Sequence, residues 1–177
     1  ITLGAPIIVA LLFGTLQIAE SSELTDRPSQ NLRKNGIHIT ADKLVAEIDA
    51  SEIDFIGNVE ARQGEVVINS DRLKVIYDPN SAGNQSTALK SDTVRKIIAG
   101  GRVKIEYENI TAEADRAEYS TESAILVLTG NPSRVTRDGQ IITGAKFTLH
   151  HNDGTIKVES KGEQRVKAIF LITRGLQ

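Results

Sequence analysis

An alternation of apolar and polar residues, with a period of two, dominates the chain from Ile37 onward and constrains its fold more than any other feature. Ile37 and Ile39 alternate with polar neighbours, and the same pattern recurs later, for example in Val103-Lys-Ile-Glu106. Successive side chains of a β-strand point to opposite faces, so this period predicts strands with one face on an apolar interior. Beyond the N-terminal leader no stretch has convincing helical spacing. The sequence therefore predicts an all-β fold.

Two short elements repeat along this strand-rich region. The first reads Ile-x-Ala/Ser-Asp and the second reads Gly-x-Val. The first occurs at 39–44 and 68–73, with a degenerate copy at 110–116. The second occurs at 57–59 and 101–103, and a third copy at 130–132 has Pro in place of Val. The steps from Ile39 to Ile68 and from Gly101 to Gly130 have the same length. Strand units at a fixed period predict a stacked architecture in which each unit buries its face only against its neighbours.

The repeated carboxylates Asp42, Asp71 and Asp115 are predicted to be structural rather than catalytic. A short carboxylate accepts backbone N–H groups at a bend, and a spacing of one whole repeat places the three on successive layers and not in one pocket. The glycines of the second element are predicted to be strand bends. His150 and His151 are adjacent, so their rings point to opposite faces of a strand and do not readily share a metal. We predict no catalytic residue, no metal ligand and no cofactor.

The composition excludes several classes of function. The net charge of −2 argues against a nucleic-acid-binding protein, which usually carries a strongly positive surface. The aromatic content of 4% also provides few side chains on which the bases of single-stranded nucleic acids could stack. The absence of cysteine excludes disulfides, thiolate metal sites and cysteine nucleophiles. The apolar residues are mainly Ile, Val, Leu and Ala, which suit strands and an aliphatic interior.

The chain divides into three predicted parts. Residues 1–19 carry no charge and include a dense apolar run, which is typical of a secretory signal peptide or of an uncleaved hydrophobic anchor. Residues 20–36 are polar and turn-rich and are predicted to be a linker. Residues 37–177 form the predicted β-domain, with a polar insertion at 78–93 that is predicted to be a loop.

Several segments in order resemble the OstA-like domain of the LptA family of periplasmic lipopolysaccharide-transport proteins. The likeness runs from about Ile37 to Val166, and two departures are Gly36, where the family often has Pro, and Pro132 in the third Gly-Asn-x element. No single segment is specific, whereas the ordered set is fairly specific. The segments are Gly36–Asp42, Phe55–Val59, Gln63–Leu73, Ala114–Tyr119, Leu126–Asn131, Ile142–Phe147 and Lys161–Val166.

The resemblance implies a half-open, twisted β-jellyroll of stacked antiparallel strands, a β-taco, whose groove takes the lipid A acyl chains of lipopolysaccharide. It implies a non-enzymatic carrier in the periplasm that stacks head-to-tail through its edge strands. The implied partners are LptC-like proteins of the inner membrane and LptD-like proteins of the outer membrane. An LptC-like anchored member of the same pathway, a structural β-solenoid module and a β-solenoid carbohydrate enzyme remain as alternatives.

The period of two and the matching strands of the family together predict which residues face the lipid. If Ile37 and Ile39 are the first residues of the inner face, then residues of the same parity on later strands should also point to the inner face. The predicted set is Ile37, Ile39, Phe55, Val66, Ile68, Val103, Ile105, Tyr119, Leu126, Leu128, Phe147 and Leu149.

The predicted edges of the sheet are the strand through Ile37 and Ile39 and the C-terminal run Val166–Thr173. The C-terminal run is strongly β-prone, and no later strand of the chain follows it to cover Phe170 and Ile172.

Overall fold

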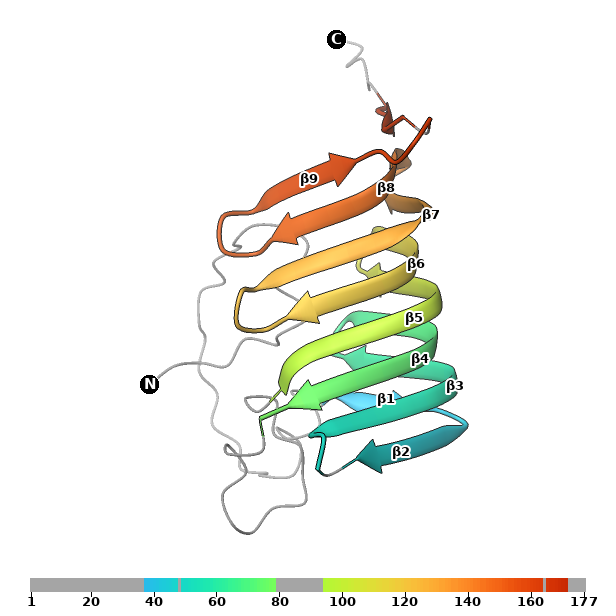
Figure 1. Ribbon diagram of the computed structural model, residues 1–177. Helices are drawn as coiled ribbons and strands as arrows, with labels where there is room; N and C mark the ends of the chain where they lie inside the picture. Colours follow the sequence, from blue (N-terminus) through green and yellow to red (C-terminus); the bar gives the residue numbers. More distant parts are fainter. Residues whose placement is uncertain (1–36, 48, 79–93, 164, 172–177) are drawn as a thin grey trace, which may run out of the picture.

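The computed structural model describes residues 37–47, 49–78, 94–163 and 165–171, and every regular element in these ranges is a β-strand. All strands belong to one ten-stranded antiparallel sheet (Figure 1), which confirms the predicted all-β fold. The strands are β1 (His38–Thr40), β2 (Lys43–Glu47), β3 (Glu52–Gln63), β4 (Val66–Tyr77), β5 (Val94–Tyr107), β6 (Ile110–Ser120), β7 (Ile125–Arg137), β8 (Gln140–His150), β9 (Thr155–Glu159) and β10 (Lys167–Ile169).

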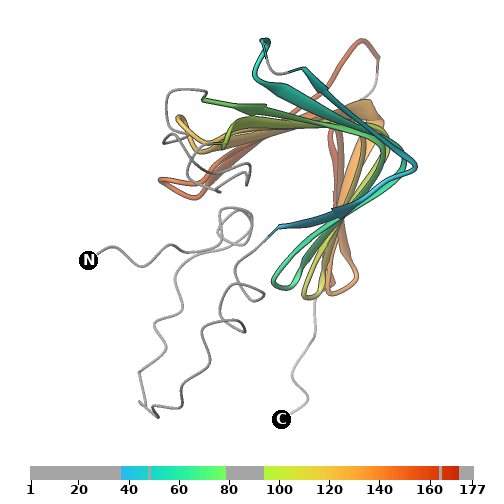
Figure 2. The same ribbon diagram turned by 90° about the horizontal axis from the view of Figure 1, so that it is seen from below.

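The sheet is folded along its middle into two arms that meet at a corner (Figure 2). The long strands β3 to β8 cross the corner, whereas the short strands at each end belong to one arm only. Arm one has the order β2-β3-β4-β5-β6-β7-β8-β9, and arm two has the order β1-β3-β4-β5-β6-β7-β8-β10. Arm one comprises residues 43–47, 52–56, 72–77, 94–100, 116–120, 125–129, 146–150 and 155–159; arm two comprises 38–40, 59–63, 66–70, 103–107, 110–114, 133–137, 140–144 and 167–169.

The faces of the two arms that look toward each other form the core. Side chains from both arms join a single hydrophobic cluster, in which Leu73 and Val59 are almost fully buried. Burial of aliphatic side chains contributes about 1.5–3 kcal/mol each, so the contact between the arms is the main stabilising feature of the fold. We call the two facing surfaces the inner face and the opposite surfaces the outer face.

Charged residues on the outer face pair across neighbouring strands. Arg72 donates two hydrogen bonds to Asp54, at 3.0 and 2.6 Å, and Lys74 pairs with Glu52 and lies 3.8 Å from Asp54. The hydrogen bond from Arg72 is the largest cause of a lowered pKa at Asp54, which keeps this largely buried carboxyl ionised. Cross-strand ion pairs of this kind help to fix the register of the sheet.

The corner explains the two repeated sequence elements. Each aspartate of the first element contacts the Gly-x pair of the second element on the neighbouring strand. Asp42 lies against Gly57 and accepts a 2.9 Å hydrogen bond from Asn58 Nδ2; Asp71 lies against Gly101 and accepts hydrogen bonds from Arg102; Asp115 lies beside Gly130 and accepts a 3.1 Å hydrogen bond from the Asn131 N–H. We call this series the corner ladder.

The corner ladder agrees with the predicted structural role of the three aspartates and refines it. The carboxylates lie at bulges where the register of long strands shifts, for example between Ile56 and Val59. Among the described residues, Asp115 accepts its hydrogen bond from a backbone N–H, whereas Asp42 and Asp71 accept theirs from side chains. Gly57 and Gly101 adopt φ values of 81° and 74°, in the region that favours glycine, so the strands bend there as predicted.

Substitution of Gly101 by Ala should destabilise the protein, whereas substitution of its neighbour Gly100 should not. A Cβ at position 101 would collide with the Asp71 carboxylate and would also require a positive φ. We expect Gly101→Ala to lower the free energy of unfolding by roughly 1–3 kcal/mol. A Cβ at Gly100 meets no atom within 4 Å, so Gly100→Ala is the matched control. Urea denaturation measures both variants, and an equal loss in the two would contradict the role of the corner ladder.

Some sequence predictions concern residues outside the described ranges. These are the leader at 1–19, the linker at 20–36, residues 79–93 of the predicted loop, and Ile172 and Thr173 of the predicted C-terminal strand. Within the described ranges, no helix has the length and apolar character needed to cross a membrane.

Candidate functional site

The residues predicted to face lipid lie on the inner face of the sheet. Ten of the twelve belong to the buried hydrophobic cluster, and Ile39 packs against it from β1. Ile37 precedes β1 and is half-buried. The structure therefore brings these residues together on one continuous surface, although they come from seven different strands.

The inner face is organised as apolar rows that run across the strands from one end of the sheet to the other. Cross-strand pairing links each residue of a row to the next, so a row follows the long axis of the stack. Three rows are continuous: Leu44-Phe55-Leu73-Ala99-Ala117-Leu128-Phe147-Val158 and Ala46-Ile53-Val75-Ile97-Tyr119-Leu126-Leu149-Ile156 in arm one, and Ile39-Ala61-Ile68-Ile105-Ala112-Val135-Ile142-Ala168 in arm two. We call these three rows the apolar track.

The predicted set contains fewer than half of the residues of the apolar track, mainly because the corner changes the parity of several strands. On β4 the inward residues are Val66 and Ile68 before the corner but Leu73 and Val75 after it. An uninterrupted period of two cannot follow such a shift. The small residues Ala99 and Ala117 were missed for another reason, since alanine carries little hydrophobic signal.

The apolar track remains exposed at both ends of the molecule. All large hydrophobic side chains that are exposed in the described ranges lie in or next to the four end strands: Leu44, Ile156, Val166, Ile169, Phe170 and Leu171. Leu44 is 57% exposed on β2 and Phe170 is 61% exposed after β10. Monomeric proteins seldom place exposed apolar residues together on unpaired strand edges, so these ends are candidate contact surfaces.

The predicted edges need one correction. The N-terminal edge does contain the strand through Ile39, but β2 forms the edge of the other arm. At the C-terminal end, the described part of the predicted strand 166–173 is paired only at Lys167–Ile169, and β9 forms a second edge that the sequence did not reveal. The physical reason is the corner, which gives each end of the folded sheet two separate edges.

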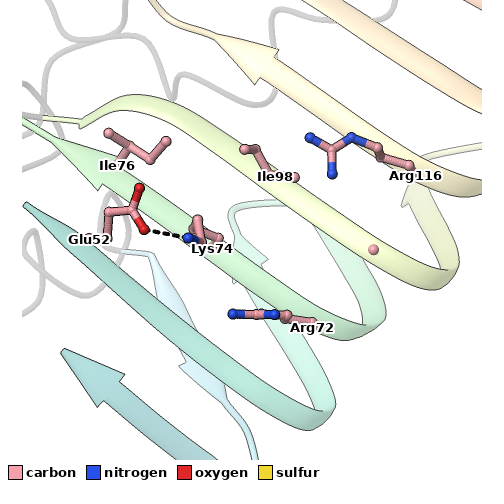
Figure 3. A pocket seen from close by; sticks show the side chains of 7 residues that line it. Glu52, Arg72, Lys74, Ile76, Ile98 and Arg116 are labelled. Carbon is pink, nitrogen blue, oxygen red and sulfur yellow. Dashed lines mark hydrogen bonds and ion pairs between the residues drawn. The ribbon is translucent and has the colours of Figure 1, made fainter. Parts of the chain in front are cut away.

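A hollow of about 330 Å³ lies on the outer face of arm one (Figure 3). Arg72, Lys74 and Arg116 surround it, and each of these cations already pairs with a carboxylate. The hollow shares no residue with the apolar track. Its charged side chains belong to the cross-strand ion pairs of the outer face, and we assign the hollow no binding role.

The described residues offer little that could support catalysis or metal binding. No group of three or more His, Asp or Glu side chains is placed to hold a metal ion in these ranges. Asp42, Asp71 and Asp115 lie in different parts of the sheet, and each accepts hydrogen bonds from a residue at the corner. They therefore do not form the pair of neighbouring carboxylates that glycoside hydrolysis requires.

Comparison with known proteins decides the family. Residues 38–155, which span β1 to the start of β9, match the sequence profile described as the LptA/(LptD N-terminal domain) LPS transport protein. The chain belongs to this family. The resemblance found in the sequence is therefore confirmed.

Two relatives of this LptA/LptD N-terminal family member extend the comparison. The lipopolysaccharide export system protein LptA of Haemophilus influenzae is 22% identical over 164 residues, which cover 91% of this chain and 90% of that protein. LptH of Pseudomonas aeruginosa, described as the LptA homologous periplasmic component of the lipopolysaccharide transport device, matches with a TM-score of 0.61 at 14% identity. That match covers 77% of this chain and 96% of LptH and supports the shared open β-jellyroll fold.

Proposed function

We propose that this protein binds the acyl chains of lipopolysaccharide on its inner face and passes the lipid across the periplasm, from the inner to the outer membrane. The observation that carries the proposal is the apolar track, which runs without a charged residue from β2 to β9 and from β1 to β10. Each CH₂ removed from water contributes about 0.8 kcal/mol, so a few acyl chains are held firmly. Because the contacts are not directional, a bound chain can slide along the rows.

In this proposal the protein is a carrier and not an enzyme. The inner face consists of aliphatic side chains with a few aromatic rings, and its buried polar side chains in the described ranges are Gln63, Ser70 and Ser133. Residues 37–177 act as the lipid-binding domain in the periplasm, after export directed by residues 1–19. The two relatives, an export protein and a periplasmic component, support this assignment.

We further propose that copies stack head-to-tail through their end strands. Among the described residues, each arm has an even number of strands that alternate in direction, so its first and last described strands run in opposite directions. A copy displaced along the stack therefore places its β2 antiparallel to β9, and its β1 antiparallel to β10, without being turned over. This contact is heterologous and does not close, and it joins Val158 of one copy to Leu44 of the next.

The same end strands are the proposed contacts for an LptC-like protein at the inner membrane and an LptD-like protein at the outer membrane. An unpaired strand edge accepts any partner that presents a complementary strand. The exposed apolar residues at both ends give such a contact an apolar component that would be shielded only after pairing. The apolar track then continues from one protein into the next.

Binding of lipopolysaccharide with and without its acyl chains tests the proposed function. The full chain should bind intact lipopolysaccharide and release an apolar fluorescent probe from its interior as it does so. The deacylated saccharide should not displace the probe at the same concentration, because the apolar track offers it no partners. Equal binding of the two would favour a carbohydrate-binding solenoid, and binding of neither would favour a purely structural module.

A further inference from the structure

The outer face of arm one carries a row of side chains that begins and ends with opposite charges. It is the outer-face row closest to the corner, and strand pairing links its members from β2 to β9. We call it the charged row: Lys43-Ile56-Arg72-Gly100-Arg116-Thr129-Lys146-Glu159. Since β2 and β9 are at opposite ends of the stack (Figure 1), the row ends in a cation at one end of the molecule and in a carboxylate at the other.

Both end residues of the charged row are accessible to a second molecule. Lys43 is exposed on β2, and its neighbour in register on β3 is the apolar Ile56. Glu159 is 39% exposed; it pairs with Lys157 at 3.0 Å along β9, and its neighbour in register on β8 is Lys146. A carboxylate has two oxygens with about four acceptor positions, so Glu159 can keep its partner on β9 and accept from a further cation as well.

End-to-end stacking brings these two charges together. The contact that continues the apolar track places Val158 opposite Leu44 of the next copy, and the adjacent positions of the two antiparallel strands are then opposite each other too. Glu159 therefore faces Lys43 of the next copy on the outer face. Side chains directly opposite across antiparallel strands have Cβ atoms about 4.5–5.5 Å apart, which is within reach of an ion pair.

The remaining outward positions of β9 and β2 suit the same register. Lys157 faces Val45 of the next copy, and Thr155 faces its Glu47. No two like charges are therefore directly opposite between these two strands. Because like charges at opposite positions destabilise a pair of strands, their absence from this register favours it.

Registers shifted by two residues, which also keep the inner face inward, are less suitable. A shift in one direction places Lys157 opposite Lys43 of the next copy, so that two cations face each other. A shift in the other direction moves Ile156 past Glu47, the last residue of β2, and leaves this apolar side chain without a partner on that strand. Charge and apolar contacts thus favour one common register.

We propose that Glu159 of one copy forms an ion pair with Lys43 of the next copy, and that this pair selects the register in which copies stack. The inference rests on the proposed stacking and adds to it the contact that recognises the partner, which is a second copy of this chain. Burial of apolar side chains favours association but is not directional, whereas an ion pair requires opposite charges at matched positions. The selected register is the one that keeps the apolar track continuous.

Charge reversal at the two positions tests the proposal. The full chain is prepared with Lys43→Glu, with Glu159→Lys and with both changes together, and sedimentation velocity over a series of concentrations measures the association of each. Either single change places like charges at every junction, so we expect association about threefold to tenfold weaker than that of the native chain. The double variant, and an equimolar mixture of the two single variants, bring opposite charges together again and should recover association.

A control variant and the salt dependence distinguish the ion pair from a general effect of charge or misfolding. Glu47→Lys reverses a charge on the same face of the same strand, but position 47 faces Thr155 of the next copy. Combined with Glu159→Lys in one chain, it should not recover association. Added salt screens exposed charges, so it should weaken association of the native chain and strengthen that of the single variants.

The outcomes separate this inference from the proposed stacking. Native-like association of both single variants would overturn the ion pair while stacking stands. Weakened single variants that do not recover in the double variant and in the mixture would also overturn it, as would recovery through Glu47→Lys, because the loss would not depend on these two positions. If the native chain stays monomeric, the proposed stacking itself fails and the ion pair fails with it.

Discussion

A photo-crosslinking residue at position 105 should capture lipopolysaccharide, whereas the same residue at position 104 should not. Ile105 is buried on the inner face and belongs to the apolar track of arm two. Lys104 is its neighbour on β5, points to the outer face and pairs with Glu106. If acyl chains lie between the arms, only the inward side chain is within reach of them. The measurement is the yield of the protein–lipopolysaccharide adduct after irradiation of cells.

The pair of positions serves as its own control. Both lie on one strand near the middle of the sheet, so expression and location in the cell are matched between the two variants. Circular dichroism checks that the bulky residue at the buried position leaves the β-fold intact. Equal adduct yields at 105 and 104 would show that lipid does not distinguish the two faces, and the inner face would then lose its proposed role.

A variant blocked at either end of the molecule should no longer self-assemble. A mixture of the two variants should form dimers, in which the intact end of one variant pairs with the intact end of the other. Leu44→Glu places a charge on an exposed position of the β2 edge. Deletion of 166–177 together with Ile156→Glu removes β10 and charges the β9 edge. Because the proposed contact is heterologous, each blocked form retains one intact end. Light scattering should therefore find each form monomeric at all concentrations and an equimolar mixture dimeric.

The native chain provides the reference for this experiment, since it should form longer oligomers as its concentration rises. Both blocked forms should still bind lipopolysaccharide, because most of the apolar track lies between the ends. A native chain that stays monomeric at high concentration would argue against end-to-end stacking. A blocked form that assembles as well as the native chain would show that the contact lies elsewhere on the surface.

The strands, and a part of their inward residues, were accessible from the sequence. Alternation around Ile37 and Ile39 set the parity, and it correctly placed Val103 and Ile105 on the same inner face. The repeat also pointed to the corner, because the aspartates and glycines recur at the bulges. Local patterning sufficed here because each strand buries one face against its neighbours and long-range contacts follow the order of the chain.

The folded geometry supplied what local patterning could not. The parity change between Ser70 and Leu73 depends on a bulge, which is set by pairing with both neighbouring strands. The division of each end into two edges depends on the corner and is visible only once the arms are assembled.

The even strand count of each arm restricts how such a carrier can change in length. One additional strand would reverse the direction of the last strand, and a following copy would then meet it in parallel, with a mismatched edge. A hairpin of two strands preserves the junction and also adds one glycine corner and one aspartate corner to the ladder. Longer or shorter relatives that assemble in this way should therefore differ by whole hairpins, so that evolution lengthens the path of the lipid in steps of about 10 Å.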